Sequence, residues 1–193
     1  MKKIKEIINA SITTKLDLLN DERKIHEICE VKDAIVESFK KGHKLLLCGN
    51  GGSAADAQHL ASEFSGRYLL DRPALFAEAL HSNVTAMTAI SNDYGYEHAL
   101  QRILESKAKQ GDVLWALSTS GNSLNVVNAL KKAKSLGVIT VGLTGHEKSE
   151  MDAFCDHLIK VPSTSTPRIQ ECHMMIGHII CEIVELKLFN PKK

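Results

Sequence analysis

His59 and Glu63 stand four residues apart in a stretch, residues 54–65, whose composition favours a helix. Residues at this spacing share one face of a helix, so the imidazole and the carboxylate would point the same way. Two such side chains can bind one metal ion. An exposed histidine and glutamate at this spacing are nevertheless more often a solvated pair on a helix surface, and spacing alone leaves both interpretations open.

Two loops rich in glycine and serine could bind an anion. Gly49-Asn50-Gly51-Gly52-Ser53 and Ser118-Thr119-Ser120-Gly121-Asn122-Ser123 each follow a short apolar run and precede a predicted helix. A helix N-terminus offers unpaired N–H groups and the positive end of a dipole, and glycine lets the backbone approach a ligand closely. Neither loop contains Lys or Arg, so neutral donors would have to hold a phosphate.

Other interpretations of the two loops remain open. The first could be a tight turn between a strand and a helix, and Ser123 could be an N-cap, a position that serine often takes. Gly49-x-Gly51-x-x-Ala54 also fits a dinucleotide-binding pattern, with Glu78 further along the chain. That match is weak because a nicotinamide-binding domain has no use for a second loop rich in hydroxyl groups.

The predicted last helix, from about Pro167 to Phe189, contains Gln170 and His178. Along a helix these two residues lie about 12 Å apart and point about 80° away from each other. One ion can therefore hardly meet both from a single copy of the chain, unless Gln170 precedes the helix proper. His178 stands in an apolar segment, where a histidine bonded to backbone in the core is the simpler interpretation.

The elements that must position these residues alternate between helix and strand. Apolar spacings of three and four predict two helices within residues 1–42. Strands are predicted at residues 44–48, near 74–80, and at 113–117, 138–143 and 157–161, with helices at 54–65, 83–91, 97–109, 124–136 and 167–189. Parallel strands need crossover connections, so the pattern predicts a doubly wound α/β sheet flanked by helices. We expect one domain over residues 1–193, with an α/β core at 43–193 and the N-terminal helices packed on it or on a partner subunit.

The composition narrows the class of protein. The chain has 193 residues, of which 44% are hydrophobic and 24% charged, as in an ordinary globular domain. Its net charge of +1 lacks the excess of Lys and Arg that sequence-independent binding of nucleic acid requires. No apolar run approaches the roughly 20 residues that are needed to span a bilayer. The five cysteines have no CxxC spacing. We therefore expect a cytoplasmic protein with reduced thiols and with neither nucleic acid nor a membrane as partner.

Further motifs follow one another along nearly the whole chain: Cys48–Ser53, Gln58-His59, Glu63–Tyr68, Arg72-Pro73, Ser91–Gly95, Gly111–Val113, Ser118–Ser123, Leu143–Gly145, Val161-Pro162, Arg168–Glu171 and His178. In this order they resemble the sugar isomerase (SIS) domain proteins and, within them, the bacterial phosphoheptose isomerases. The resemblance implies a flavodoxin-like sheet. It also implies an aldose–ketose isomerase that converts sedoheptulose 7-phosphate to D-glycero-D-manno-heptose 7-phosphate through an enediol, the first step toward ADP-heptose.

The resemblance also assigns residues to roles. Substrate, chiefly its phosphate, would be held by Asn50, Gly51, Gly52, Ser53, Ser118, Thr119, Ser120 and Ser123, and the sugar by Glu63, Asn92, Asp93 and Gln170. One zinc ion per site would be bound by His59, Glu63, Gln170 and His178. Glu63 is the candidate catalytic base and His178 its acid/base partner. Thr166, in a segment that varies among relatives, becomes a further candidate sugar contact.

The resemblance further implies a homotetramer with active sites shared between subunits. The 12 Å separation of Gln170 and His178 led us to expect that His59 and Glu63 of one subunit meet His178 of another. The main rival is a non-catalytic SIS protein, either a regulator that senses sugar phosphates or a protein that binds a replication initiator. Members of the second group tend to lack the carboxylate of the first loop's helix and the second histidine of the last helix, and both are present here.

Overall fold

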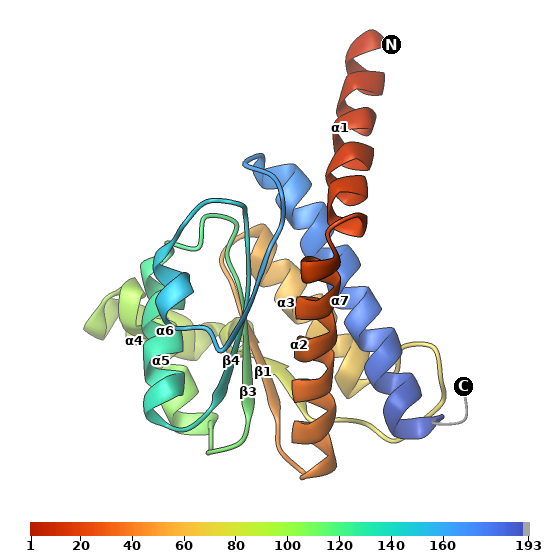
Figure 1. Cartoon of the computed structure of the whole chain (residues 1–193). Helices are drawn as coiled ribbons and strands as arrows, with labels where there is room; N and C mark the ends of the chain where they lie inside the picture. The colour runs from red at the N-terminus through yellow and green to blue at the C-terminus, as the bar shows by residue number, and fades with distance from the viewer. Residues whose placement is uncertain (191–193) are drawn as a thin grey trace.

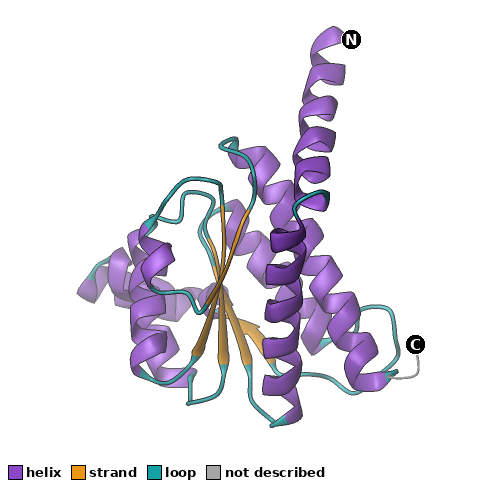
Figure 2. Ribbon diagram, in the orientation of Figure 1, coloured by secondary structure: helices purple, strands orange, loops and turns teal. Residues whose placement is uncertain are grey.

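A computed structural model describes residues 1–190 as a five-stranded parallel sheet with helices on both faces (Figures 1 and 2). The strands are β1 (Leu45–Cys48), β2 (Ala77–Ala79), β3 (Val113–Leu117), β4 (Ile139–Thr144) and β5 (His157–Lys160). Their order across the sheet is β2-β1-β3-β4-β5, and every neighbouring pair is parallel. This is the flavodoxin-like order, so the predicted fold class is confirmed.

Seven α-helices occupy the described residues: α1 (Lys2–Leu19), α2 (Glu22–Lys40), α3 (Gly52–Ser65), α4 (Val84–Tyr94), α5 (Tyr96–Lys107), α6 (Leu124–Ser135) and α7 (Thr166–Phe189). Two short 3₁₀ helices, η1 (Leu80–Ser82) and η2 (Glu150–Ala153), complete the list. Helices α2, α3 and α7 cover one face of the sheet, and α5 and α6 cover the other (Figure 1).

Alternating side chains of each strand supply both cores. In β1, Leu45 and Leu47 pack with α2, α3 and α7, whereas Leu46 and Cys48 pack with α5 and α6. All four are at most 1% exposed. A strand that is buried on both faces has no polar side to show, which explains why β1 and β3 are continuous apolar runs in the sequence.

The two N-terminal helices have different environments. Helix α2 lies on the sheet between β5 and α7 and forms part of its cover. Helix α1 projects away from the body of the molecule (Figure 1) and buries only Thr14 and Leu18. Arg168 and Glu171 of α7 hold it by bonds to the Ile7 carbonyl and the Ser11 hydroxyl, so α1 rests on the start of α7.

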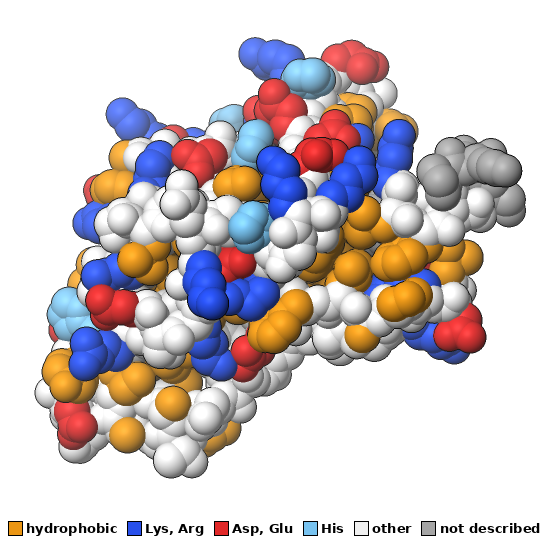
Figure 3. All heavy atoms as spheres, turned by 90° about the horizontal axis from the view of Figure 1, so that it is seen from below, with side chains coloured by type: hydrophobic (Ala, Val, Ile, Leu, Met, Phe, Trp, Pro, Cys, Tyr) orange, Lys and Arg blue, Asp and Glu red, His pale blue; other side chains and the backbone are white. Residues whose placement is uncertain are grey.

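The surface carries charges of both signs. On the face seen in Figure 3, Lys and Arg side chains are interspersed with Asp and Glu side chains. Among the described residues, no helix combines the length and the apolar character that a bilayer span requires.

Helices α3 and α7 run side by side and pack closely. A Cβ atom on Gly177 would lie 2.5 Å from a methyl carbon of Leu60, which is fully buried on α3. About two turns toward the N-terminus of each helix, a Cβ on Gly52 would lie 2.2 Å from the amide nitrogen of Gln170. Glycine at these two positions therefore allows the two helices to approach each other.

We expect Gly177→Ala to lower the free energy of unfolding by about 1–2 kcal/mol. Overpacking a filled interface costs roughly 1–3 kcal/mol, which exceeds the gain of up to about 1 kcal/mol that alanine brings to a helix interior. Urea unfolding measures the change. In a Leu60→Ala background the same substitution should cost much less, because the methyl groups that it meets are gone. Unchanged or increased stability with Leu60 present would contradict the close packing.

Candidate active site

Three side chains from α3 and α7 meet at the point where these helices touch. His59 Nε2 lies 3.0 Å from His178 Nε2 and 3.2 Å from a carboxylate oxygen of Glu63. One ligand atom from each of the three lies within 4.8 Å of the others. His59 is about half exposed and Glu63 is 19% exposed, so the cluster opens to solvent on one side. The predicted shared face of His59 and Glu63 is confirmed, and it faces α7.

This cluster has the donor set of a catalytic zinc site. Two imidazoles and one carboxylate are a known three-ligand set, and the fourth position is left open for water or substrate. Neutral histidine and ionised glutamate are the protonation states that ligation needs. The residues His59, Glu63 and His178 therefore fit a zinc ion in both identity and spacing.

His178 was expected from a second subunit, and this expectation is wrong. A single chain brings it to His59 and Glu63, because α7 returns across the sheet directly beside α3. The helical spacing of Gln170 and His178 restricts what those two residues can share. It carries no information on the distance between α7 and α3, which the tertiary packing sets.

Gln170 is directed at the glycine loop. Its amide lies against Gly52, seven residues before His59 on α3, and Gln170 itself lies eight residues before His178 on α7. Seven or eight residues of helix correspond to about 10–12 Å. The Gln170 amide therefore lies with the loop residues and not with the cluster, as its 12 Å separation from His178 along α7 indicated. Gln170 is thus not a fourth metal ligand in this chain, and the cluster consists of His59, Glu63 and His178.

The buried core histidine of α7 is His173, whereas His178 is partly exposed. His173 is fully buried, and its Nε2 lies 3.3 Å from the carbonyl oxygen of Thr144. Burial lowers the pKa of His173 to about 4, so this imidazole is neutral at physiological pH. The simpler interpretation that the sequence suggested for His178 thus applies to its neighbour on the same helix.

Both hydroxyl-lined loops lie at the carboxyl edge of the sheet. The first follows β1 and the second follows β3, and these two strands are paired. The chain leaves them in opposite directions, through α3 to β2 and through α6 to β4, which makes this edge the topological switch point where ligands bind in open α/β sheets. Helices α3 and α6 begin at the two loops, so both helix N-termini face the same place.

Ser118 and Ser123 close the second loop on itself. Their hydroxyl oxygens lie 3.2 Å apart, and the N–H of Gly121 donates to Ser118 Oγ. Ser123 stands at the N-cap position of α6, but its side chain makes no capping bond. The N-cap interpretation therefore does not describe what this hydroxyl does. Ser53 and Ser118 are both 4% exposed, so each hydroxyl lies below the surface of its loop.

The side chain of Asn50 joins the two loops. Its amide exchanges two hydrogen bonds of 2.8 Å with the amide of Asn125 on α6, and the Tyr96 hydroxyl also donates to Asn50 Oδ1 at 2.8 Å. These partners take both acceptor positions of Oδ1 and one of the two N–H groups of the Asn50 amide. Asn125 and Tyr96 could not be identified from the sequence, because only the fold brings them to the first loop.

Asn92 and Asp93 lie in the last turn of α4. Helix α4 ends at Tyr94, two residues before the Tyr96 side chain that reaches Asn50. Both predicted sugar contacts are exposed, and Asn92 donates to Asp93 at 3.0 Å. Within the described residues neither side chain hydrogen-bonds to the loops or to the cluster.

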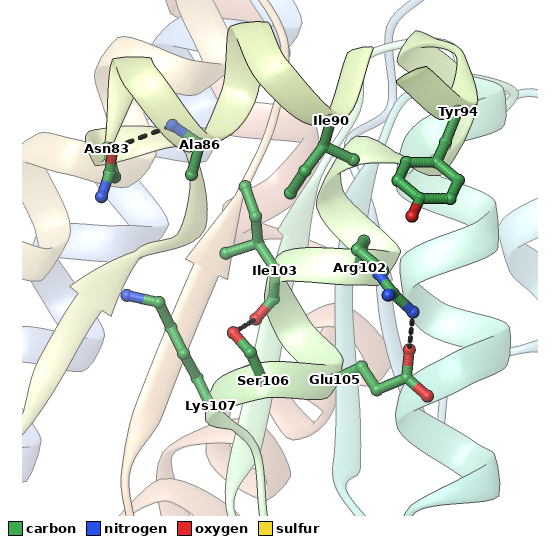
Figure 4. A pocket seen from close by; sticks show the side chains of 9 residues that line it. All are labelled: Asn83, Ala86, Ile90, Tyr94, Arg102, Ile103, Glu105, Ser106 and Lys107. Atoms are coloured by element: carbon green, nitrogen blue, oxygen red, sulfur yellow. Dashed lines mark hydrogen bonds and ion pairs between the residues drawn. The ribbon is translucent and has the colours of Figure 1, made fainter. Parts of the chain in front are cut away.

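A hollow of about 260 Å³ adjoins the second loop. Thr119 and Ser120 line one side, Thr166 and Ile169 of α7 line another, and His146 lies between them. The position of Thr166 suits the sugar contact suggested for it, and His146 was not singled out from the sequence. A larger hollow of about 560 Å³ lies between α4 and α5 (Figure 4), but none of the predicted site residues line it.

Comparisons with known proteins identify the family of the chain. Residues 9–145 match the family model of the SIS domain. The chain is 49% identical over 189 residues to the phosphoheptose isomerase of Aneurinibacillus thermoaerophilus, covering 98% of this chain and 96% of the relative. It is 48% identical over 185 residues to that of Clostridium acetobutylicum, covering 96% of this chain and 94% of the relative.

Solved structures are similar over the same length. A phosphoheptose isomerase from Francisella tularensis superposes with a TM-score of 0.91 at 31% identity, covering 95% of this chain and 96% of that chain. The phosphoheptose isomerase of Neisseria gonorrhoeae gives 0.89 at 34% identity, covering 95% and 97%.

We expect Ser123→Ala to weaken the binding of inorganic phosphate about tenfold with little change in stability. A hydrogen bond to a charged group contributes about 1.5 kcal/mol, and the Ser123 side chain caps no helix that its loss could destabilise. Isothermal titration and thermal unfolding measure the two quantities. Asn83→Ala is the matched control, since Asn83 caps α4 through the Ala86 N–H: it should cost about 1 kcal/mol and leave phosphate binding unchanged. If Ser123→Ala instead lowered the stability by about 1 kcal/mol and left phosphate binding unchanged, Ser123 would have a capping role.

Proposed function

Because the chain belongs to the SIS domain family and, within it, to the phosphoheptose isomerases, we propose that it converts sedoheptulose 7-phosphate to D-glycero-D-manno-heptose 7-phosphate. The reaction is an aldose–ketose isomerisation that opens the synthesis of ADP-heptose. One observation carries the proposal: a single pair of helices, α3 and α7, starts near the two hydroxyl-lined loops and holds the His59, Glu63 and His178 cluster further along.

The loops would bind the phosphate end of the substrate. We assign this role to the hydroxyls of Ser53, Ser118, Thr119, Ser120 and Ser123 and to the backbone N–H groups of Asn50, Gly51 and Gly52. Gly51 has a φ of +53°, a conformation that glycine adopts without strain and that turns the chain into α3. The helix N-termini add their dipoles to these neutral donors. Contacts to a phosphate remote from the reacting carbons orient the substrate for the chemical step.

Glu63 would move the proton. In a ketose-to-aldose step its carboxylate takes a proton from C1 to give an enediol and returns it to C2, while a proton passes from O1 to O2. Glu63 is partly exposed at the open side of the cluster, where a substrate can reach it. Asn92, Asp93 and Gln170 are the proposed contacts to the sugar hydroxyls. Thr166 joins them through its place in the hollow beside the second loop.

Zinc would be held by His59, Glu63 and His178, and when bound it polarises the substrate carbonyl and stabilises the enediolate. His178 cannot be ligand and acid/base through the same nitrogen, because a nitrogen that binds a metal has no lone pair left for a proton. Glu63 has two carboxylate oxygens and can serve in both ways. We therefore assign the transfer of the proton between C1 and C2 to Glu63. His178 is the next candidate for this role should Glu63 prove dispensable.

We propose a homotetramer on the basis of an exposed apolar surface. Ile4, Ile8 and Ile12 on α1 are 49–61% exposed. A groove of about 340 Å³ continues this surface between α1, α2 and α7, lined by Leu16, Ile25, Met175 and Ile179 among others. A contiguous apolar surface of this kind marks a protein–protein interface. In the assembly each chain supplies its own His59, Glu63 and His178, and a neighbour's Asn92 and Asp93 complete the sugar end.

A non-catalytic role as a regulator receives no specific support. The cluster contains the carboxylate and the second histidine that the proteins binding a replication initiator tend to lack. The relatives at 48–49% identity described above are named as isomerases. A cytoplasmic location stays a prediction from the sequence.

Glu63→Gln should lower kcat at least about 100-fold and leave KM for sedoheptulose 7-phosphate nearly unchanged. The amide keeps the size of the side chain but cannot accept the proton, and general acid–base catalysis contributes about 10²–10⁴-fold. Loss of deuterium incorporation at C1 and C2 reports the missing transfer directly, and metal analysis checks that zinc is still bound. Glu37→Gln, on the exposed side of α2, is the control and should behave as wild type. Robust exchange in Glu63→Gln would transfer the base role to His178.

Mixing two inactive variants tests how the sites are divided among subunits. Glu63→Gln and His178→Asn chains, unfolded together and refolded as mixed tetramers, should stay inactive because every chain carries one defect in its own cluster. Glu63→Gln mixed with Asp93→Ala should regain activity in about a quarter of the sites, since a neighbour supplies Asp93. Recovery in the first mixture would show that the cluster is split between chains. Failure of the second would place Asp93 in its own chain's site.

A further inference from the structure

A buried carboxylate, Glu185, lies two turns beyond His178 on the same face of α7. It accepts hydrogen bonds from the backbone N–H groups of Tyr68, Leu69 and Leu70 at 2.8–3.0 Å and from Arg72 Nε at 2.9 Å. Burial of the carboxyl by itself would raise its pKa, but these donors outweigh burial and hold the pKa of Glu185 below its ordinary value. The group is therefore ionised and saturated with donors from one segment of chain.

Arg72 connects this carboxylate to the end of α3. Like Glu185, its side chain is 2% exposed. Its guanidinium donates to the backbone carbonyls of Glu63 and Phe64 at 2.8 Å each. Carbonyls in the last turn of a helix have no partner within the helix, so Arg72 supplies what the end of α3 lacks. The turn of α3 that carries Glu63 is thereby tied, through one buried ion pair, to the helix that carries His178.

The segment whose N–H groups bind Glu185 also places an aromatic ring, that of Tyr68, against His178. The rings of Tyr68 and His178 stack with centroids 5.9 Å apart and planes inclined by 23°. The His59 ring meets His178 edge-on at 5.2 Å. His178 thus has contacts from Tyr68 and from His59, and the Tyr68 N–H is fixed by Glu185. An imidazole with these neighbours is restrained in both position and plane.

We propose that Arg72, Glu185 and Tyr68 are positioning residues that hold Glu63 and His178 in the geometry the reaction requires. The proposal rests on the isomerase function proposed above. A buried ion pair is by itself weak grounds for stability, since apolar residues of equal volume often replace such a pair without loss. Here each partner also holds backbone next to a residue of the cluster, which a purely stabilising pair would not need to do.

The test compares variants that keep the fold and change the restraint. Glu185→Gln keeps the shape but loses charge and an acceptor, and Tyr68→Ala removes the ring while leaving the ion pair in place. Both should lower kcat about tenfold with KM within about twofold, and both should weaken zinc affinity of the metal-free protein about tenfold, as changes around metal ligands do. Tyr68→Phe should recover most of what Tyr68→Ala loses, because the stacked ring returns.

Glu105→Gln is the matched control, since Glu105 forms an exposed ion pair with Arg102 on α5, away from the cluster. It should leave kcat and zinc affinity as in wild type. If Glu185→Gln does not fold, the two Tyr68 variants decide the question alone. Folded variants with wild-type kcat and zinc affinity, or with a raised KM and normal kcat, overturn the positioning role.

The zinc titration needs no turnover, so it separates the two proposals. A wild-type chain that binds zinc but does not isomerise the sugar phosphate refutes the proposed function, while the zinc affinities of the variants still test the restraint on the cluster. A wild-type chain that does neither overturns both.

Discussion

The close approach of α3 and α7 is the constraint on which the site depends. Gly177 lets α7 lie directly against Leu60, and the next residue along α7, His178, then reaches His59. A side chain at position 177 would push the helices apart, which matters for two imidazole nitrogen atoms that lie 3.0 Å from each other. The same contact aligns the starts of both helices, where Gly52 meets Gln170. One helix pair thus sets the relation between the first loop and the cluster of His59, Glu63 and His178.

The molecule handles charge differently at the two ends of this helix pair. At the loops, the proposed anion site, hydroxyls, amides and helix N-termini are the available donors, and Asn50 and Asn125 hold the loops together without a formal charge. At the far end, Arg72 and Glu185 form an ion pair in which each side chain is 2% exposed. Exposed neutral donors can return to water when a ligand leaves, whereas a buried charge would be left unpaired if either partner of the ion pair moved.

Local sequence rules predicted most of the fold. Strand β3 has the predicted bounds, and the ends of the other strands differ from the predicted ends by at most three residues. Apolar runs that are bounded by turn residues identify buried strands well. His59 and Glu63 share a face because a helix imposes it. Arg72 and Glu185 could not be paired in advance, since 113 residues separate them and each is an ordinary charged residue to local rules. The origin of His178 was misjudged for the same reason: spacing within one helix carries no information on which helix lies beside it.

Helix α4 packs on α5 through side chains that are only partly buried, Ala86, Met87 and Ile90 among them, and none of its residues is fully buried. Less buried apolar surface holds α4 than holds α5 or α6, so its displacement costs less free energy than theirs. Its last turn carries Asn92 and Asp93, and any ligand that engages them must also keep this turn ordered. In the proposed site, recognition of the sugar and the local folding of α4 would therefore be one linked equilibrium: part of the intrinsic affinity would be used to order the helix, and a bound sugar would in turn protect α4 from opening.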